Sequence, residues 1–219
     1  MPTQTLPGSV KPAPAGAMGF DVNHVLTADQ ALDFKNAGYN FCIRYVPRTA
    51  ALAPGNITNA EALSILAAGL ALMPVQHVSL PGWKPTTNLG TMYGNFAATW
   101  CAQTVKLPKG MNVWCDLEEV ADGSPAQDVV SYCQAWYNAV HAAGYVPGLY
   151  VGYGTGLTPD QLYNDTSFQH YWRAYNGGQV TTRGFQLLQK TELTLHGITF
   201  DPDVTQLDHE GDAALWLSA

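Results

Sequence analysis

Short apolar runs alternate with amphipathic segments along most of this chain. The apolar runs predict buried strands over residues 19–23, 41–46, 72–78, 112–118, 146–153 and 170–175. Segments with helical spacing lie between these runs and predict helices over residues 28–37, 60–68, 91–105 and 124–143, and a shorter helix from residue 158. The order of the elements therefore predicts five consecutive β-α units.

The pattern changes towards the C-terminus. Residues 184–189 and 198–200 predict a seventh and an eighth strand without clear helices between them, and residues 212–217 predict a final helical turn. Five β-α units followed by three strands with few helices predict an α/β fold, a modified β/α barrel of the TIM type with parallel strands. A doubly wound open sheet is the alternative, but no G-x-G-x-x-G or Walker loop follows an early strand.

The pattern predicts one barrel domain over residues 18–219. Residues 1–17 are rich in Pro, Gly and Ala, and we expect them to form a flexible lead. No apolar run reaches the roughly 18 residues of a membrane span, and no signal peptide is visible in the sequence. We therefore expect synthesis in the cytoplasm.

The composition and charge of the chain limit which kinds of partner and cofactor are expected. Charged residues make up 12% of the chain, about half of the usual share, so a cluster of carboxylates is more informative here than in an average protein. The net charge of -7 and the absence of a basic stripe in the sequence argue against nucleic acid as a partner. The four cysteines form no C-x-x-C pair and predict buried free thiols. His24, His77 and His170 lack metal-binding spacing, so we expect neither a metal nor an organic cofactor.

The strand over residues 112–118 ends in acids. Asp116 and Glu118 are two residues apart, so on a strand they share one face, with Cα atoms roughly 6.5–7 Å apart. Two acids so close repel each other, and the pattern predicts a raised pKa for at least one of them. We expect Asp116 to stay ionised while Glu118 keeps its proton, as general acid catalysis at a glycosidic bond requires. The alternative is a strand end that leads into a solvated acidic turn.

Further acids lie at the ends of other predicted strands. Asp21 ends the first strand, whereas Asp201 and Asp203 follow the last one. In a parallel barrel these ends converge on one mouth, which favours the catalytic interpretation. Arg44 lies within an apolar strand, where a charge needs a partner; we expect it to pair with a barrel acid or to reach solvent at the rim.

The order of short motifs resembles that of family 25 glycoside hydrolases, the lysozymes with a modified β/α barrel. The motifs are Gly19–Asn23, Asp116–Glu118, Tyr171–Tyr175, Phe185-Gln186 and Phe200–Asp203. The pattern is more similar to the related glycoside-hydrolase-like group, long catalogued as a domain of unknown function, which it matches at Gly19–Asn23, at the strand with Ile43-Arg44-Tyr45 and at the acidic strand. This chain departs from family 25 in Asp201-Pro202-Asp203, where that family has an Asp-x-Asn pattern, and in the extra acid Glu119.

The resemblance implies a role for each matching acid. It implies that Glu118 protonates the leaving-group oxygen and that Asp116 stabilises positive charge or assists the attacking group. Asp21 and Asp201 would orient substrate and water. With aromatic residues suited to sugar stacking, the expected substrate-binding residues are Asp21, Asp201, Asp203, Glu119, Arg44, Trp172, Tyr175, Tyr150, His77 and Gln186.

The expected function is hydrolysis of a glycan, with peptidoglycan as the expected substrate and partner. The alternatives are a non-catalytic glycan-binding barrel and a glycosidase for another polysaccharide. An enzyme of this kind made without an export signal would reach the cell wall after lysis or through a secretion machine.

Overall fold

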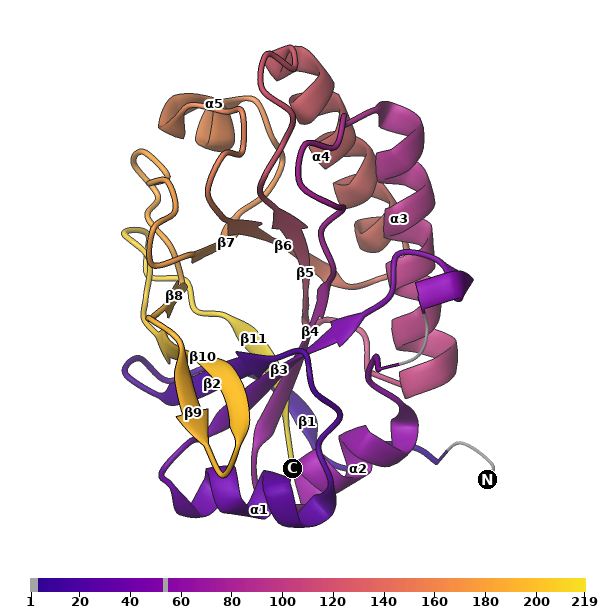
Figure 1. Cartoon of the computed structure of the whole chain (residues 1–219), viewed down its shortest axis with the longest axis vertical. Helices are drawn as coiled ribbons and strands as arrows, with labels where there is room; N and C mark the ends of the chain where they lie inside the picture. Colours follow the sequence, from indigo (N-terminus) through magenta and orange to yellow (C-terminus); the bar gives the residue numbers. More distant parts are fainter. Residues whose placement is uncertain (1–3, 53–54) are drawn as a thin grey trace.

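In the part of the chain that the computed structural model describes, residues 4–52 and 55–219, eight strands close into a barrel (Figure 1). Around the barrel the order is β4-β3-β2-β10-β8-β7-β6-β5, and pairing of β5 with β4 closes the ring. The eight strands are β2 (Met18–Val22), β3 (Phe41–Val46), β4 (Ala71–Gln76), β5 (Asn112–Leu117), β6 (Val146–Val151), β7 (His170–Arg173), β8 (Leu187–Gln189) and β10 (Ile198–Thr205). The predicted modified α/β barrel is confirmed.

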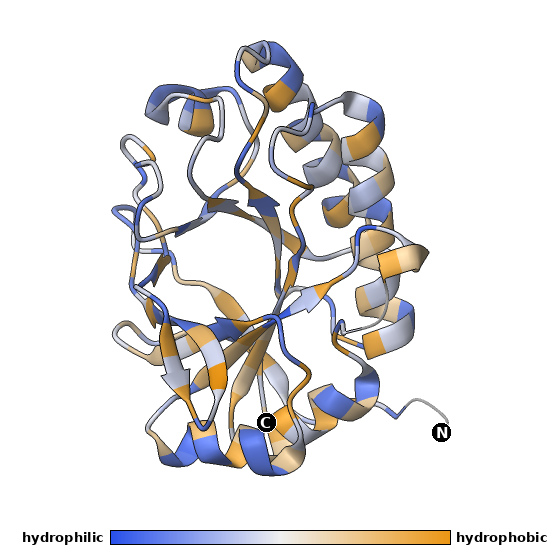
Figure 2. Ribbon diagram, viewed as in Figure 1, coloured by the Kyte–Doolittle hydropathy of each residue, from blue (hydrophilic) through white to orange (hydrophobic). Residues whose placement is uncertain are grey.

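The helices cover the outside of this barrel. They are α1 (Ala28–Asn36), α2 (Asn59–Ala67), α3 (Thr87–Thr99) with a π-helical continuation (Trp100–Val105), α4 (Ala126–Ala142) and α5 (Pro159–Asn164), with a short 3₁₀ turn at Ala50–Leu52. Figure 2 shows hydrophobic and hydrophilic residues mixed along α1 and α2, as expected for helices with one face on the barrel. Helices α3 and α4 lie side by side in close contact, since a Cβ atom on Gly90 would come within 2.2 Å of the Tyr132 carbonyl oxygen.

The strands near the C-terminus do not follow the predicted parallel arrangement. Strand β10 runs antiparallel to both β2 and β8, and β11 (Leu215–Ser218) runs antiparallel to β4. The prediction of a wholly parallel barrel is therefore wrong. The physical reason is the connection between β8 and β10, which contains only the short strand β9 (Leu193–Leu195) and no crossover helix that could return the chain in the same direction.

The predicted helical turn at residues 212–217 is also wrong, because residues 215–218 form strand β11. Trp216 packs inside the barrel while Leu217 belongs to the core outside it, a period of two that suits a strand. The predicted flexible lead is wrong for β1 (Ser9–Pro12), which pairs with β11 along its whole length. Residues 1–3 lie outside the described residues. The edge of β11 supplies the hydrogen bonds that hold this polar segment.

Two apolar cores lie on the two sides of the barrel wall. The inner core includes Phe41, Ile43, Met73 and Trp216, and it fills the barrel interior near the N-terminal ends of the parallel strands. The outer core lies between the strands and the helices and contains all four cysteines, which are buried free thiols as predicted. Polar side chains replace apolar ones at the opposite end of the barrel interior, where the candidate site lies.

Candidate active site

Asp116 and Glu118 face the same cavity at the mouth of the barrel. The cavity has a volume of about 240 Å³, slightly below the range of about 300–1,000 Å³ that is common for small-molecule sites. Its lining residues are Tyr45, Val75, Asp116, Glu118, Tyr150, Trp172, Tyr175, Asn176, Gln189 and Asp201. The structure thus brings together six of the residues that the sequence singled out: both proposed catalytic acids, Asp201, Tyr150, Trp172 and Tyr175.

The two acids of β5 differ in their surroundings. Asp116 is buried within the strand, whereas Glu118 lies just after it and is half-buried. Burial, with the nearby charges of Glu119 and Asp201, raises the pKa of Glu118 to about 7. Burial and the charge of Glu118 raise the pKa of Asp116 well above its usual range. Both acids thus have raised pKa values, in agreement with the prediction of a raised pKa for at least one of them. That Asp116 stays ionised while Glu118 is protonated stays a prediction.

Space for Glu118 depends on the neighbouring strand. Gly152 follows β6, and a Cβ atom there would lie 2.4 Å from the Cβ atom of Glu118. Any larger residue at this position would displace the carboxylate from the mouth. The backbone beyond Glu118 is held in place as well, because the Glu119 N–H donates to the Tyr153 carbonyl and the Glu119 carbonyl accepts from the Gly82 N–H.

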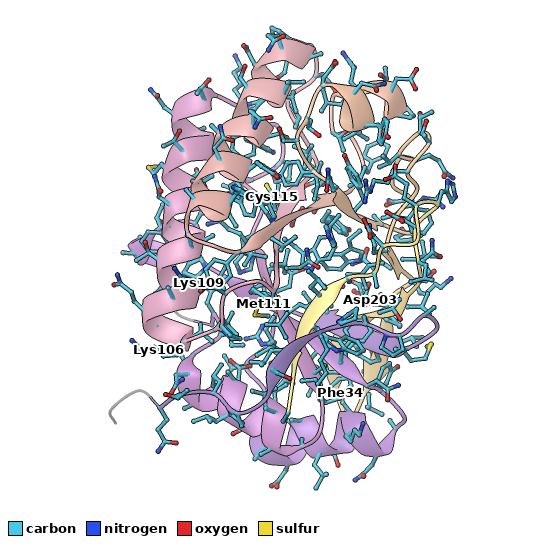
Figure 3. All side chains as sticks on the ribbon, turned by 180° about the vertical axis from the view of Figure 1, so that it is seen from behind. Phe34, Lys106, Lys109, Met111, Cys115 and Asp203 are labelled. Carbon is cyan, nitrogen blue, oxygen red and sulfur yellow. The ribbon has the colours of Figure 1, made fainter. Side chains whose placement is uncertain are left out.

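Asp21 and Asp203 form a buried layer of acids next to the cavity. The Asp21 carboxylate accepts hydrogen bonds from the Tyr45 hydroxyl at 3.0 Å and the Gln189 amide at 2.8 Å. Burial, aided by the charge of Asp201, raises the pKa of Asp21 to about 7 against the effect of these donors. Asp203 accepts from the Trp172 indole at 2.9 Å, and burial raises its pKa well above the usual range. Its place on the barrel wall can be followed in Figure 3.

Aromatic side chains form one wall of the cavity. Tyr150 and Trp172 pack edge to face with ring centroids 4.6 Å apart, and the Tyr150 hydroxyl donates to Gln189 at 2.8 Å. These contacts fix the orientation of both rings. Tyr175 keeps 57% of its surface exposed at the opening, so its ring is available to a ligand. Apolar ring faces beside carboxylates are suited to the C–H faces and hydroxyl groups of sugars.

Four lining residues were not predicted from the sequence: Tyr45, Val75, Asn176 and Gln189. Tyr45 and Gln189 were detectable in principle. Tyr45 lies two residues after Ile43, which points into the barrel, and Gln189 lies two residues after Leu187, which does the same. Asn176 follows β7 in a turn, where no periodic pattern marks it.

Two predicted substrate-binding residues lie away from the cavity. Arg44 is completely buried on the outer side of β3, where its guanidinium binds Glu61 of α2 at 2.7 Å, so its partner is not a barrel acid. The reason is strand alternation: Arg44 follows the inward-facing Ile43 and must point outwards. Gln186 is buried beside Tyr171. Its side-chain oxygen accepts a hydrogen bond from the Tyr171 backbone N–H at 2.6 Å, and its side-chain nitrogen donates one to the Asp208 carboxylate. Both residues stabilise the barrel wall.

Two further predicted residues lie at the rim without lining the cavity. His77 follows β4 and stacks on the Tyr45 ring at 4.4 Å, and burial beside Arg48 lowers its pKa to about 4. Glu119 has a left-handed backbone with a φ of 52° and an exposed side chain. It acts on the site through its charge, which raises the pKa of Glu118.

A larger hollow of about 650 Å³ lies between α3 and α4, away from the mouth acids. Uncharged polar residues such as Thr91, Gln134 and Asn138 form most of its lining. Within residues 4–52 and 55–219, no three His, Cys, Asp or Glu residues are grouped closely enough to hold a metal ion. None of the described helices combines the length and apolar character needed to cross a membrane.

Comparison with known proteins agrees with this architecture. A solved structure with the same fold is the Mycobacterium tuberculosis Tat-secreted protein Rv2525c in complex with L-tartrate, which is 14% identical and superposes with a TM-score of 0.66 over 91% of this chain and 99% of that one. Another is an uncharacterized protein from B. stearothermophilus, 17% identical, with a TM-score of 0.63 over 87% of this chain and 96% of that one. No curated protein matches at a significant level.

At these identities the two structures establish the fold alone. The sequence profile of the Rv2525c-like, glycoside hydrolase-like domain matches residues 32–205, which include the acidic strand and every residue that lines the cavity. This match confirms the predicted relationship to a glycoside-hydrolase-like group. The chain belongs to the Rv2525c-like, glycoside hydrolase-like family.

Proposed function

We propose that this protein hydrolyses glycosidic bonds in a glycan and that its substrate is peptidoglycan. The observation that carries the proposal is the cavity at the mouth, where Asp116 of β5 and Glu118 just after it share the lining with Asp201 of β10, Trp172 and Tyr175. A carboxylic acid with a raised pKa next to rings that can hold a sugar is the arrangement that glycosidic cleavage uses.

In the proposed reaction Glu118 is the general acid. Its pKa of about 7 keeps it protonated in weakly acidic and near-neutral solution, so it can donate its proton to the glycosidic oxygen as the bond from that oxygen to the anomeric carbon breaks. The oxygen of a water molecule then bonds to the anomeric carbon, and the Glu118 carboxylate takes up the proton that this water releases. Each turnover thus returns Glu118 to its starting state.

The remaining acids position the reactants in this proposal. Asp116 faces the same cavity as Glu118, and burial and the charge of Glu118 raise its pKa, so its carboxyl group is suited to hold substrate or water by a hydrogen bond. Asp201 lines the cavity, and Asp21 lies behind it on the neighbouring strand. Their carboxyl groups are suited to orient the sugar and the attacking water.

A test with purified protein separates this activity from glycan binding alone. The protein is incubated with isolated cell-wall sacculi, and the release of reducing ends is measured beside the amount of protein bound. Release by the native protein but not by Glu118→Gln supports hydrolysis. Equal binding by both proteins without release identifies a non-catalytic glycan-binding barrel, and release from another polysaccharide but not from sacculi changes the proposed substrate.

We also propose that the protein acts outside the cytoplasm, at the cell wall. A related fold occurs in a protein described as Tat-secreted, which supports this location, and either a secretion route or release on lysis would bring the protein to its substrate. Fractionation of producing cells before and after lysis distinguishes the two routes. Protein in the medium of intact cells indicates secretion.

A further inference from the structure

The cavity at the barrel mouth is lined by acids and aromatic rings, and none of its described lining residues is basic. The acids are Asp116, Glu118 and Asp201, and the aromatic residues are Tyr45, Tyr150, Trp172 and Tyr175. The other three lining residues are uncharged. Carboxylates attract positive charge, and so do the faces of aromatic rings, which proteins combine into cages for ammonium groups. The composition of the lining therefore favours a cationic ligand.

The acids of the cavity have no counter-charge within the part of the chain that the structure describes. The carboxyl groups of Glu118 and Asp201 form neither a hydrogen bond nor an ion pair with any described residue. Asp116 is only 7% exposed, and one of its oxygens has no hydrogen-bond partner among these residues. Burial, with the charges of neighbouring acids, raises the pKa of all three acids, so protons take the place of a missing cation.

The arginines are engaged elsewhere in the fold. Arg44 binds an acid of α2, and Arg183 binds three acids beyond the end of β10. Arg48 and Arg173 each lie over an aromatic ring that does not line the cavity. The fold thus supplies an arginine to another group of acids but no described cation to those at the mouth. A positive charge that compensates the mouth acids has to come with the ligand.

The aromatic residues are arranged so that their rings, and not their polar atoms, are available to this ligand. The hydroxyl groups of Tyr45 and Tyr150 and the indole N–H of Trp172 all donate to buried side chains, at distances of 3.0, 2.8 and 2.9 Å. These hydrogen bonds fix the rings at the cavity and occupy their donors. Tyr175 adds a ring at the opening, where more than half of its surface is exposed.

The acids of the cavity also come from different sides of the barrel. Asp116 belongs to β5 and Glu118 follows it, whereas Asp201 belongs to β10, which is four strands away on the ring of eight. A cation in the cavity therefore lies between acids of opposite walls. Asp201 is partly exposed, so a ligand can reach its carboxylate while Glu118 stays available to the glycosidic oxygen.

We propose that the mouth cavity binds an ammonium group, carried by an amino sugar whose amine is not acetylated, with Asp201 as its main partner. The assignment to a glycan rests on the proposed function, although the ammonium site itself does not. An acetylated amine is uncharged and leaves the acids without a counter-charge. A negatively charged group would be repelled by them. The cavity volume of about 240 Å³ suits a small group of this kind.

The ammonium site is tested first with sugars that differ only at one position. The Trp172 indole N–H resonance of the ¹⁵N-labelled full chain is followed at pH 6.5 during titration with glucosamine hydrochloride, N-acetylglucosamine and glucose, with sodium chloride as a control for the salt. Glucosamine should saturate the shift at about tenfold lower concentration than either neutral sugar, as expected for one charge-assisted pair. No saturable shift with glucosamine, or equal affinity for a neutral sugar, overturns the site.

Variants then assign the contacts. Asp201→Asn should weaken glucosamine binding about tenfold, and Asp201→Glu, which keeps the charge, should restore most of it. Tyr175→Leu should weaken it about two- to fivefold through loss of a ring at the opening. The matched control is Asp122→Asn, which removes one exposed carboxylate from the loop after Glu118 and should leave the affinity unchanged. Thermal unfolding checks that each variant is folded.

Two results with these variants would contradict the proposal. Equal weakening by Asp201→Asn and Asp122→Asn would show a general effect of net charge. Equal weakening of all three sugars by Asp201→Asn would show that this carboxylate does not distinguish an amine from a hydroxyl or an acetamide. Either result overturns the ammonium site.

Polymeric substrates separate this inference from the proposed function. Peptide-free glycan strands are de-N-acetylated, and half of the material is acetylated again, so that the two samples differ only in their amines. Tighter binding of the strands with free amines supports the inference, and equal or tighter binding of the acetylated strands overturns it. If glucosamine binds but neither sample is cleaved, the ammonium site stands and the proposed hydrolysis fails. If acetylated strands are cleaved and glucosamine does not bind, the hydrolysis stands and the ammonium site fails.

Discussion

Asp21 and Asp201 lie directly opposite each other on the antiparallel strands β2 and β10. Asp21 is near the C-terminal end of its strand, whereas Asp201 is in the middle of its own, so the two carboxyl groups reach the same level of the barrel from chains that run in opposite directions. Their proximity has an electrostatic consequence, because the charge of Asp201 adds to burial in raising the pKa of Asp21 to about 7.

The raised pKa of Asp21 predicts a pH-dependent contribution to stability. The folded protein keeps a proton on Asp21 that the unfolded chain, with a pKa near 3.8, releases. The stabilisation that protonated Asp21 gives the folded protein is therefore complete below about pH 4 and is lost as the pH rises through about 7. We expect the stability of the native protein relative to Asp21→Asn to fall by about 1–4 kcal/mol between pH 4 and pH 8.

Urea unfolding of both proteins across this range measures the effect. The difference between the proteins is the informative quantity, because the lowered pKa values of His77 and His170 change the stability of each protein alone in the opposite direction. A difference that stays constant from pH 4 to pH 8 would contradict the burial of an uncharged Asp21.

Glu118→Gln should abolish most of the hydrolysis without unfolding the protein. The amide has the same shape but cannot donate an acidic proton, and general acid catalysis contributes about 10²–10⁴-fold to rate. Initial rates on sacculi give the comparison. Asp122→Asn is the matched control, since it removes one carboxylate from an exposed position in the same loop and should keep the native rate. A Glu118→Gln rate above roughly a tenth of the native rate would exclude Glu118 as the acid.

The alkaline limb of the activity profile should respond to the charge of Glu119. Activity needs protonated Glu118 and falls as the pH rises through about 7. Glu119→Gln removes a negative neighbour, lowers the pKa of Glu118 and should move this limb to lower pH. Rate profiles from pH 4 to pH 9 measure the shift, and a limb that stays in place in Glu119→Gln would show that this charge does not raise the pKa of Glu118.

The acid pair of β5 and the parallel part of the barrel were predictable because both depend on local pattern. The short apolar run within residues 112–118 marks a strand, and the two-residue spacing puts Asp116 and Glu118 on one face without reference to the rest of the fold. The early strands and helices are likewise visible as apolar runs with caps, for example the capping box at Thr27.

The features that could not be predicted from the sequence depend on contacts between segments that are far apart in the chain. Strand β1 has little apolar character of its own and forms because β11 supplies an edge. The direction of β10 follows from how β8 connects to it, which no local pattern encodes. The outward direction of Arg44 follows from strand alternation, but its partner Glu61 lies on a helix 17 residues later and could not be identified from spacing alone.

The buried ion pair of Arg44 and Glu61 predicts a large loss of stability when one partner is removed. Arg44 is fully buried and Glu61 nearly so, and the Glu61 carboxylate also accepts from the Leu26 backbone N–H at 2.9 Å. Glu61→Gln leaves the guanidinium buried without a counter-charge. We expect a loss of about 3–5 kcal/mol in the free energy of unfolding, measured in urea.

A double variant distinguishes the cost of an uncompensated charge from the loss of packing. Replacing both partners by apolar residues of similar size, Arg44→Met with Glu61→Leu, removes the charges together and should be less destabilising than Glu61→Gln alone. Asp122→Asn is the surface control and should change stability by less than about 0.5 kcal/mol. If the double variant is as unstable as the sum of its two single variants, the two residues act independently, and the pairing between β3 and α2 does not account for their burial.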